Sequence, residues 1–209
     1  IKKKILTVAP LGVVGFHPAL LPKNRGRHPL IWAKVLGLKK SGNTFFFMDE
    51  GADTGDILSQ NSFKITNEDD ASSLYTKMVE LAMIQIPKLH DQLKSGKYTR
   101  KSQNKNSGNS WRKRSLRDGA IDFRQSTQQI CNLVRALTAP YVGAHITIKN
   151  NNYIVWKVQE GNIGSLKDNI EPGKVLKVLK NKIEVKTGDS SVWLVDHELD
   201  ELPQKGSYL

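Results

Sequence analysis

His17 and Asp53 are the two side chains whose types and surroundings are best suited to chemistry. His17 directly follows a short apolar run, and Asp53 lies in an acidic, glycine-containing loop that follows a second apolar run. A carboxylate beside an imidazole holds the ring in one tautomer and stabilises its cation. The pair therefore predicts an acid–base site, although His17 could also cap a turn and residues 53–56 could form only a tight turn.

The elements before Asp53 predict layers of strands and helices. Residues 13–16 predict a short buried strand, which places His17 at the C-terminal end of that strand or just beyond it. Pro29 is typical of the first turn of a helix, and Gly37 ends the apolar pattern of that helix. In open α/β sheets, ligands bind just beyond such strand ends.

Two further strands and a long helix complete the first half of the chain. Residues 43–48 predict a strand covered on both faces, and residues 57–65 predict the next strand. A helix is expected over residues 69–94, and Pro87 should kink or split it. Alternating strands and helices of these lengths indicate an α/β fold.

The pattern changes to short strands after residue 117. Ser126 is expected to cap a short helix that ends before Pro140. Hairpin turns are expected at residues 150–152 and 180–182. Five short strands and one helix suggest a small OB-like β-barrel domain. The strands are expected at residues 144–149, 153–158, 174–179, 183–187 and 192–195.

Composition limits the class of protein. The chain has 209 residues, of which 38% are hydrophobic and 25% charged, as in ordinary globular proteins. No apolar run approaches the roughly 20 residues that a membrane-spanning helix needs. The opening at Ile1 shows no initiator Met and no signal peptide, so we expect an upstream segment to be missing. The single cysteine, Cys131, predicts a reducing, cytoplasmic location and a buried, unreactive thiol.

Positive charge is concentrated in one segment. The formal net charge is +12, which suits nucleic acid, anionic membrane surfaces or phosphorylated small molecules as partners. Asn, Ser and Gly accompany the charges, which predicts a solvated basic linker at 98–117 between domains at 1–97 and 118–209. Residues 94–117 contain no Asp or Glu. The nine basic side chains of this segment are Lys94, Lys97, Arg100, Lys101, Lys105, Arg112, Lys113, Arg114 and Arg117.

Two long motifs resemble the signatures of the folate-dependent formyltransferases. Residues 16–30 are similar to the His-Pro-Ser-Leu-Leu-Pro-x-x-Arg-Gly signature of that family, and residues 43–58 resemble its second signature. Residues 118–123 and 133–144 resemble the second domain of the family. The similarity covers nearly the whole chain. It implies a partial Rossmann-like catalytic domain, without its first strands and helices, followed by the OB-like domain.

The resemblance implies that a formyl group passes from 10-formyltetrahydrofolate, the co-substrate, to a primary amine. His17 would donate a hydrogen bond to the oxyanion, and Asp53 would orient His17 and relay the amine proton. No metal is implied. The residues that would bind folate are Leu20, Leu21, Asp49, Glu50, Gly51, Ala52 and Asp53. Those that would bind the acceptor are Arg25, Gly26 and Arg27.

One position departs from the family pattern. Family members usually carry an Asn two positions before the His, and this chain has Gly15 there. Glycine supplies no side-chain donor for an oxyanion. Gly15 and the missing upstream segment therefore leave open a non-catalytic relative that binds folate or a carbohydrate. The presence of both His17 and Asp53 argues against that alternative.

The acceptor has two candidate classes. Residues 25–29 and 139–144 resemble the sugar-nucleotide amine formyltransferases more than the methionyl-tRNA enzyme, which favours the amino group of a nucleotide-linked amino sugar. The nine basic residues would also suit tRNA phosphates, so a methionyl-tRNA formyltransferase remains the alternative. Only Tyr98 and Trp111 lie among these charges, which is too few aromatic residues for a base-stacking surface.

Overall fold

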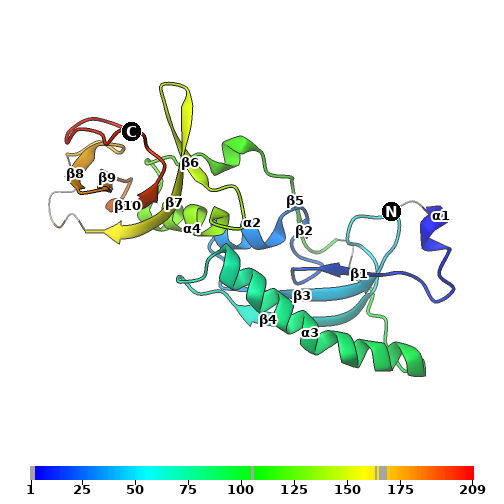
Figure 1. Cartoon of the computed structure of the whole chain (residues 1–209). Coiled ribbons are helices and arrows are strands. Elements are labelled where there is room, and N and C mark those ends of the chain that lie inside the picture. Colours follow the sequence, from blue (N-terminus) through cyan, green and yellow to red (C-terminus); the bar gives the residue numbers. More distant parts are fainter. Residues whose placement is uncertain (1–2, 105, 163, 165–168) are drawn as a thin grey trace. The chain divides into compact units, whose positions relative to one another are not determined.

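The computed structural model describes residues 3–104, 106–162, 164 and 169–209, which leaves Lys105 outside the described residues. The chain divides into two compact units, each described here by itself (Figure 1). The first unit comprises Ile1–Ala33, Leu38–Thr66 and Ser73–Arg114, and the second comprises Lys34–Gly37, Asn67–Ser72 and Ser115–Leu209. The domain boundaries drawn from the sequence stay predictions.

The first unit is built around a three-stranded sheet in the order β1-β3-β4, with antiparallel pairing throughout. No parallel strand–helix–strand unit of Rossmann type occurs among the described residues of this sheet, although α2 lies between β1 and β3 in the chain. Its elements are α1 (Lys3–Leu6), β1 (Val14–His17), β2 (Arg25–Gly26), α2 (Pro29–Val35), β3 (Lys40–Phe47), β4 (Ile57–Lys64), α3 (Ala71–Ser95) and β5 (Ser110–Trp111).

Burial differs between the strands of this sheet. The central strand β3 is buried along nearly its whole length, as its apolar sequence predicts. In β1, however, Val14 is 37% exposed and Phe16 is 40% exposed, so the prediction of a buried strand is wrong. The reason is that β1 lies at the edge of the sheet and pairs only with β3 within the described residues.

The long helix α3 is continuous and lies along the sheet (Figure 1). Pro87 is inside it, so the prediction that this residue splits the helix is wrong. Proline removes one helical hydrogen bond, but tertiary contacts before Pro87 tie α3 to the sheet. Asn43 Nδ2 donates to Met78 O at 2.7 Å, and Gln85 Nε2 donates to Ser59 Oγ at 3.0 Å.

The segment after α3 packs onto the first unit as far as Arg114. Lys101 exchanges two backbone hydrogen bonds with Ile57, at 2.8 and 2.9 Å. Strand β5 pairs in parallel with β2, and Trp111 packs against the core cluster of Ala33, Ile65 and Leu74. Long-range pairing therefore holds part of this segment, although most of its described residues are exposed, and the basic linker stays a prediction.

The second unit contains a five-stranded antiparallel sheet in the order β6-β7-β10-β9-β8, together with α4. All five strands and the helix were expected from the sequence. The elements are η1 (Leu116–Gly119), α4 (Thr127–Leu137), β6 (Ala144–Ile148), β7 (Asn151–Gly161), β8 (Val175–Leu179), β9 (Lys182–Lys186) and β10 (Ser191–His197). Strand β7 is longer than expected and begins at Asn151, so the first turn is confined to Lys149 and Asn150.

The sheet of the second unit is open, with β6 and β8 at its edges. Isolated bridges join His145 to Ala120 and Lys174 to Tyr208 at these edges. No strand pairing among the described residues joins β6 to β8, and the OB-like barrel is not confirmed. The core lies between α4 and the sheet, with Ile130, Val155 and Leu194 fully buried. Cys131 belongs to this core, and burial raises the pKa of its thiol to about 11. The prediction of a buried thiol is confirmed. The raised pKa favours an unreactive thiol, because only the thiolate is a good nucleophile, and its lack of reactivity stays a prediction.

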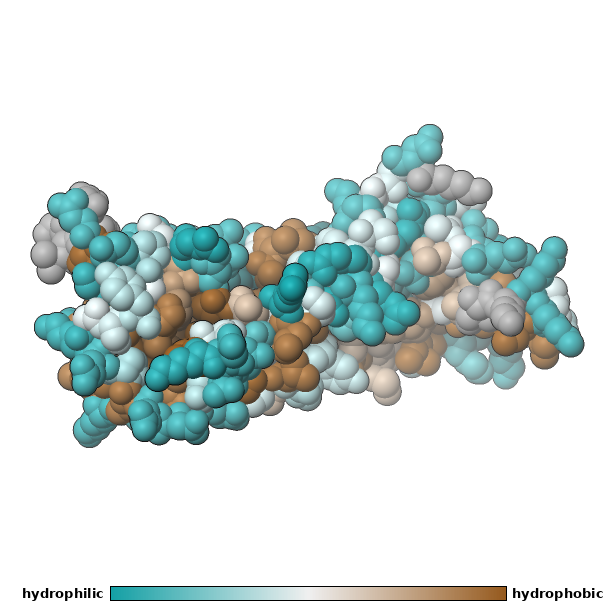
Figure 2. Space-filling view, turned by 90° about the horizontal axis from the view of Figure 1, so that it is seen from above, coloured by the Kyte–Doolittle hydropathy of each residue, from teal (hydrophilic) through white to brown (hydrophobic). Residues whose placement is uncertain are grey.

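Apolar side chains also reach the surface in several places. Figure 2 shows hydrophobic residues lying between hydrophilic ones on the face in view. Exposed examples are Tyr75, Met83 and Ile84 on α3. None of the helices in the described part of the chain is both long and apolar enough to cross a membrane.

The capping box of α4 gives a stability prediction. Gln129 N donates to Ser126 Oγ at 3.2 Å, and Ser126 N donates to Gln129 Oε1 at 3.0 Å. Ser126→Ala should lower the free energy of unfolding by about 1 kcal/mol, because a helix N–H loses its partner. Ser126→Asn, which keeps a cap, is the matched control. Equal stability of both variants in urea unfolding would show that the cap contributes nothing.

Candidate active site at the end of β1

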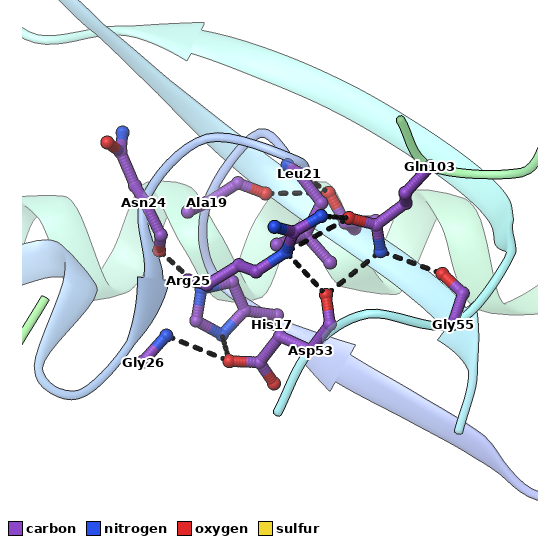
Figure 3. Close-up of polar contacts among 10 residues, drawn as sticks. His17, Ala19, Leu21, Asn24, Arg25, Gly26, Asp53, Gly55 and Gln103 are labelled. Carbon is purple, nitrogen blue, oxygen red and sulfur yellow. Dashed lines mark hydrogen bonds and ion pairs between the residues drawn. The ribbon is translucent and has the colours of Figure 1, made fainter. Parts of the chain in front are cut away.

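His17 is the last residue of β1 and is almost fully buried, with 4% of its surface exposed. Its Nε2 lies 2.7 Å from the backbone oxygen of Asn24. A carbonyl oxygen only accepts, so Nε2 carries a proton and donates it. Its Nδ1 lies 3.6 Å from Asp53 Oδ2, which is an ion-pair distance when the ring is protonated (Figure 3). The structure therefore brings together the two residues that the sequence singled out.

Asp53 is positioned by its backbone and by one hydrogen bond. Its φ is +60°, in the left-handed region that non-glycine residues other than Asn and Asp rarely adopt. The backbone N–H of Gly26 donates to Asp53 Oδ2 at 2.9 Å. The same oxygen faces His17, so one carboxylate oxygen connects the imidazole to β2.

The loop that carries Asp53 is closed by its own side chains. Asp49 Oδ1 accepts from Gly51 N at 3.0 Å and from Thr54 Oγ1 at 2.6 Å. A Cβ on Gly55 would lie 1.7 Å from Phe47 O, so only glycine fits there. The backbone of this loop is therefore held in one arrangement, in which the residues from Asp49 to Ala52 are exposed.

Gln103 belongs to the candidate site, although the sequence did not indicate it. Its side-chain nitrogen donates to Asp53 O at 2.9 Å and to Gly55 O at 2.7 Å (Figure 3). Its side-chain oxygen accepts from Arg25 Nη2 at 2.6 Å. Arg25 Nε also donates to Asp53 O, at 3.1 Å. Gln103 is a polar residue in a segment of polar residues, so no local pattern could have distinguished it.

A second set of hydrogen bonds fixes the turn between His17 and β2. Thr44 Oγ1 donates to Ala19 O at 2.6 Å and accepts from Leu21 N at 3.3 Å. Gln60 Nε2 donates to Leu21 O at 2.8 Å. The Leu21 side chain is buried against Phe46 and Ile57. Leu21 therefore supports the turn, and its surroundings do not support the predicted contact with folate.

The other predicted binding residues have two kinds of surroundings. Leu20 is half-buried, and the residues Asp49, Glu50, Gly51, Ala52 and Arg27 are exposed. In contrast, the Arg25 guanidinium and the Gly26 N–H are both used to hold Asp53. For Arg25 and Gly26 the structure thus shows a positioning contact, while a direct contact with the acceptor stays a prediction.

Gly15 lies in β1 opposite Phe46 of β3, on the strand that ends at His17. A Cβ at this position would lie 2.9 Å from Met48 Cγ and 3.0 Å from Phe46 Cζ. The space that a side chain would need is therefore occupied by core residues. The described residues also contain no group of three or more His, Cys, Asp or Glu side chains that could hold a metal ion.

This α/β protein therefore has a buried imidazole 3.6 Å from a carboxylate at the end of a strand. Two family models match its sequence. Residues 1–89 match the model described as "Formyl transferase", and residues 114–204 match "Formyl transferase, C-terminal domain". The chain belongs to the formyl transferase family.

Several known proteins are similar to this chain. The methionyl-tRNA formyltransferase of Halothermothrix orenii is 32% identical over 200 residues, which cover 94% of this chain and 63% of the relative. The bifunctional polymyxin resistance protein ArnA of Wigglesworthia glossinidia brevipalpis is 36% identical over 157 residues, which cover 75% of this chain and 24% of the relative. The chain thus spans less than two thirds of the length of either relative.

One solved structure shows the same fold. The N-formyltransferase of Helicobacter canadensis, in complex with folinic acid and dTDP-3-aminofucose, superposes with a TM-score of 0.69. The sequences are 20% identical, and the superposition covers 88% of this chain and 66% of that protein. This likeness confirms the α/β formyltransferase fold.

The surroundings of Gly15 predict that this position rejects a side chain. Gly15→Asn should lower the free energy of unfolding by roughly 1–3 kcal/mol, because Phe46 and Met48 would have to move. Gly96→Asn is the control for added side-chain volume, since a Cβ there meets nothing within 4 Å, and Asn tolerates the φ of +67° at that residue better than most side chains. Unfolding in urea measures both variants. An unchanged midpoint for Gly15→Asn would show that the core around β1 adapts freely.

Loss of the Gln103 side chain should loosen the site. Gln103→Ala leaves Gly55 O without the donor that Gln103 provides, and it removes an acceptor from Arg25. We expect a loss of about 2 kcal/mol in unfolding free energy, together with lower activity. Gln92→Ala, on the exposed surface of α3, is the control. Equal stability of the two variants would contradict a supporting role for Gln103.

Proposed function

We propose that this protein transfers a formyl group from 10-formyltetrahydrofolate to a primary amine. The observation that carries the proposal is the buried His17 side chain at 3.6 Å from Asp53, at the end of β1, in a member of the formyl transferase family. The sequence relatives named as methionyl-tRNA formyltransferases support formyl transfer. The folate in the structure of the fold neighbour supports the class of donor.

The reaction needs an acid and a proton relay. The amine lone pair attacks the formyl carbon, and the carbonyl oxygen becomes negative in a tetrahedral intermediate. The intermediate then collapses and breaks the bond between the formyl carbon and the folate nitrogen. The amine loses one proton, and the folate nitrogen gains one. The site must therefore stabilise an oxyanion and move a proton between two nitrogens.

His17 is the residue that stabilises the oxyanion. As an imidazolium, the ring carries a proton on each nitrogen, with Nδ1 facing Asp53 and Nε2 donating to Asn24 O. When substrates bind, the Nε2 hydrogen bond to the Asn24 carbonyl oxygen breaks. Nε2 then donates to the oxygen of the formyl group. A hydrogen bond from a cation in a nearly buried site is stronger than one in water.

Asp53 orients His17. Its Oδ2 accepts from Gly26 N and faces His17 Nδ1, so the carboxylate does not rotate away from the ring. Since its side chain is 23% exposed, Asp53 also reaches solvent. Through water it takes the proton that the amine loses and passes it toward the folate nitrogen.

The residues suited to hold the folate are Leu20 and the loop from Asp49 to Asp53. The loop is ordered by Asp49 and Thr54, and its exposed backbone can present N–H and C=O groups to a flat heterocycle such as pterin. When bound, 10-formyltetrahydrofolate supplies the activated formyl carbon. Leu21 acts behind this surface, through Thr44 and the core.

For the acceptor we favour the amino group of a nucleotide-linked amino sugar. The support is the similarity of residues 25–29 and 139–144 to sugar-nucleotide formyltransferases. Methionyl-tRNA is the second candidate. It is favoured by two relatives at 32% identity that are named methionyl-tRNA formyltransferase. Their alignments cover 94% and 98% of this chain.

Mass spectrometry of the products tests the proposed function and separates the two acceptors. The protein is incubated with 10-formyltetrahydrofolate and either a panel of nucleotide-linked amino sugars or methionyl-tRNA. We expect a formylated amino sugar. Formylation of methionyl-tRNA alone would replace the sugar assignment, and no formylated product with any amine would reject formyl transfer.

Substitution of the two central residues tests their roles. His17→Ala and Asp53→Asn should each lower turnover by ~10²-fold or more, because the oxyanion donor or its orienting charge is lost. Asn is chosen at position 53 because it tolerates the left-handed backbone of that residue. Thermal unfolding checks that both variants fold. Near-normal turnover of either folded variant would remove that residue from the mechanism.

A further inference from the structure

Two guanidinium groups lie over the ring of Trp32 in the first unit. The guanidinium carbons of Arg112 and Arg114 lie over the indole ring, 5.3 and 4.8 Å from its centre. Trp32 Nε1 donates to the backbone oxygen of Arg112 at 3.0 Å. The ring thus holds both guanidinium groups and the backbone beneath them. We call Arg27, Arg112, Lys113 and Arg114 the Trp32 cationic cluster.

Three charges of this cluster, those of Arg27, Lys113 and Arg114, act on a common neighbour, His28. Burial lowers the pKa of His28 first, and then Arg114, Arg27 and Lys113 lower it further. The three cations are therefore close enough to His28 to oppose another positive charge there. Arg27 and Lys113 are exposed, and neither forms an ion pair with a carboxylate within the described residues.

The cluster is joined directly to the candidate active site. Gly26, which holds Asp53, pairs with Trp111 where β2 lies beside β5. Arg27 follows Gly26 in the chain, and Arg112 follows Trp111. Consecutive Cα atoms are about 3.8 Å apart. Arg27 and Arg112 are thus each one residue beyond the paired residues Gly26 and Trp111, of which Gly26 bonds the Asp53 carboxylate.

Arg100, another basic residue of the same segment, does not extend the cluster. Arg100 pairs with Asp56 at 3.2 Å and lies over the Phe47 ring at 4.1 Å. Its charge is therefore compensated by a carboxylate. A nucleic acid backbone needs cations along many phosphates, whereas a compact group of cations suits one or two phosphates.

We propose that the Trp32 cationic cluster binds the diphosphate of a nucleotide-linked acceptor. This inference rests on the proposed function and adds the place where the acceptor is anchored. Guanidinium groups match phosphate oxygens with two parallel hydrogen bonds. Because Trp32 already orders two of them, less side-chain entropy is lost on binding. An anchored diphosphate would place the amino sugar toward Asp53.

The test measures binding of UDP, dTDP and inorganic pyrophosphate by calorimetry. The double variant Arg27→Ala, Lys113→Ala should weaken binding at least ~10-fold, since two charge-assisted contacts are lost. The double variant Lys94→Ala, Lys97→Ala removes the same charge from the same basic segment and should change Kd by less than about twofold. NMR titration of His28 gives a second measurement. Bound diphosphate should raise its pKa, because the anion offsets the cations.

The outcomes separate this inference from the proposed function. Unchanged diphosphate binding in the first double variant, in a protein that still formylates an amino sugar, would overturn the anchor and leave formyl transfer standing. Loss of diphosphate binding in that variant, in a protein that formylates no amine, would support the anchor and reject formyl transfer. Binding of tRNA that depends on Arg27 and Lys113, without binding of free diphosphates, would assign the cluster to RNA and overturn the anchor.

Discussion

The hydrogen bond from Gly26 N to Asp53 Oδ2 is the constraint on which the site depends. It fixes the carboxylate oxygen that faces His17, and it connects the loop after β3 to strand β2. Gly26 has φ +94°, and a Cβ there would lie 2.3 Å from Trp111 O. Only glycine therefore allows β2 to approach β5 and to present its N–H to Asp53 at the same time.

The sequence predicted those parts of the structure that depend on local pattern. The helix capped by Ser126 and the five strands of the second unit lie where apolar alternation and turn residues placed them. His17 at the end of β1 and Asp53 in the loop after β3 were also placed correctly, because residue types and chain order alone indicated them.

Features that depend on long-range contacts could not be predicted. Gln103 is distinguished from its polar neighbours only by carbonyl groups that are brought to it from Asp53 and Gly55. Pro87 stays inside a continuous helix because contacts to the sheet outweigh its local preference. The sheet of the second unit is open because β6 and β8 do not pair with each other. The alternation of apolar and polar residues along a strand does not determine which strands pair.

The docking of residues 98–114 on the first unit determines where the chain can be divided. A protein cut after residue 97, at the boundary that composition suggests, would keep His17 and Asp53 but would lose Gln103 and β5. The Arg25 guanidinium would then lack its acceptor, and Gly26 would lack its neighbouring strand. The smallest fragment that could preserve the pairing of His17 with Asp53 therefore extends to Arg114, the last residue of the first unit.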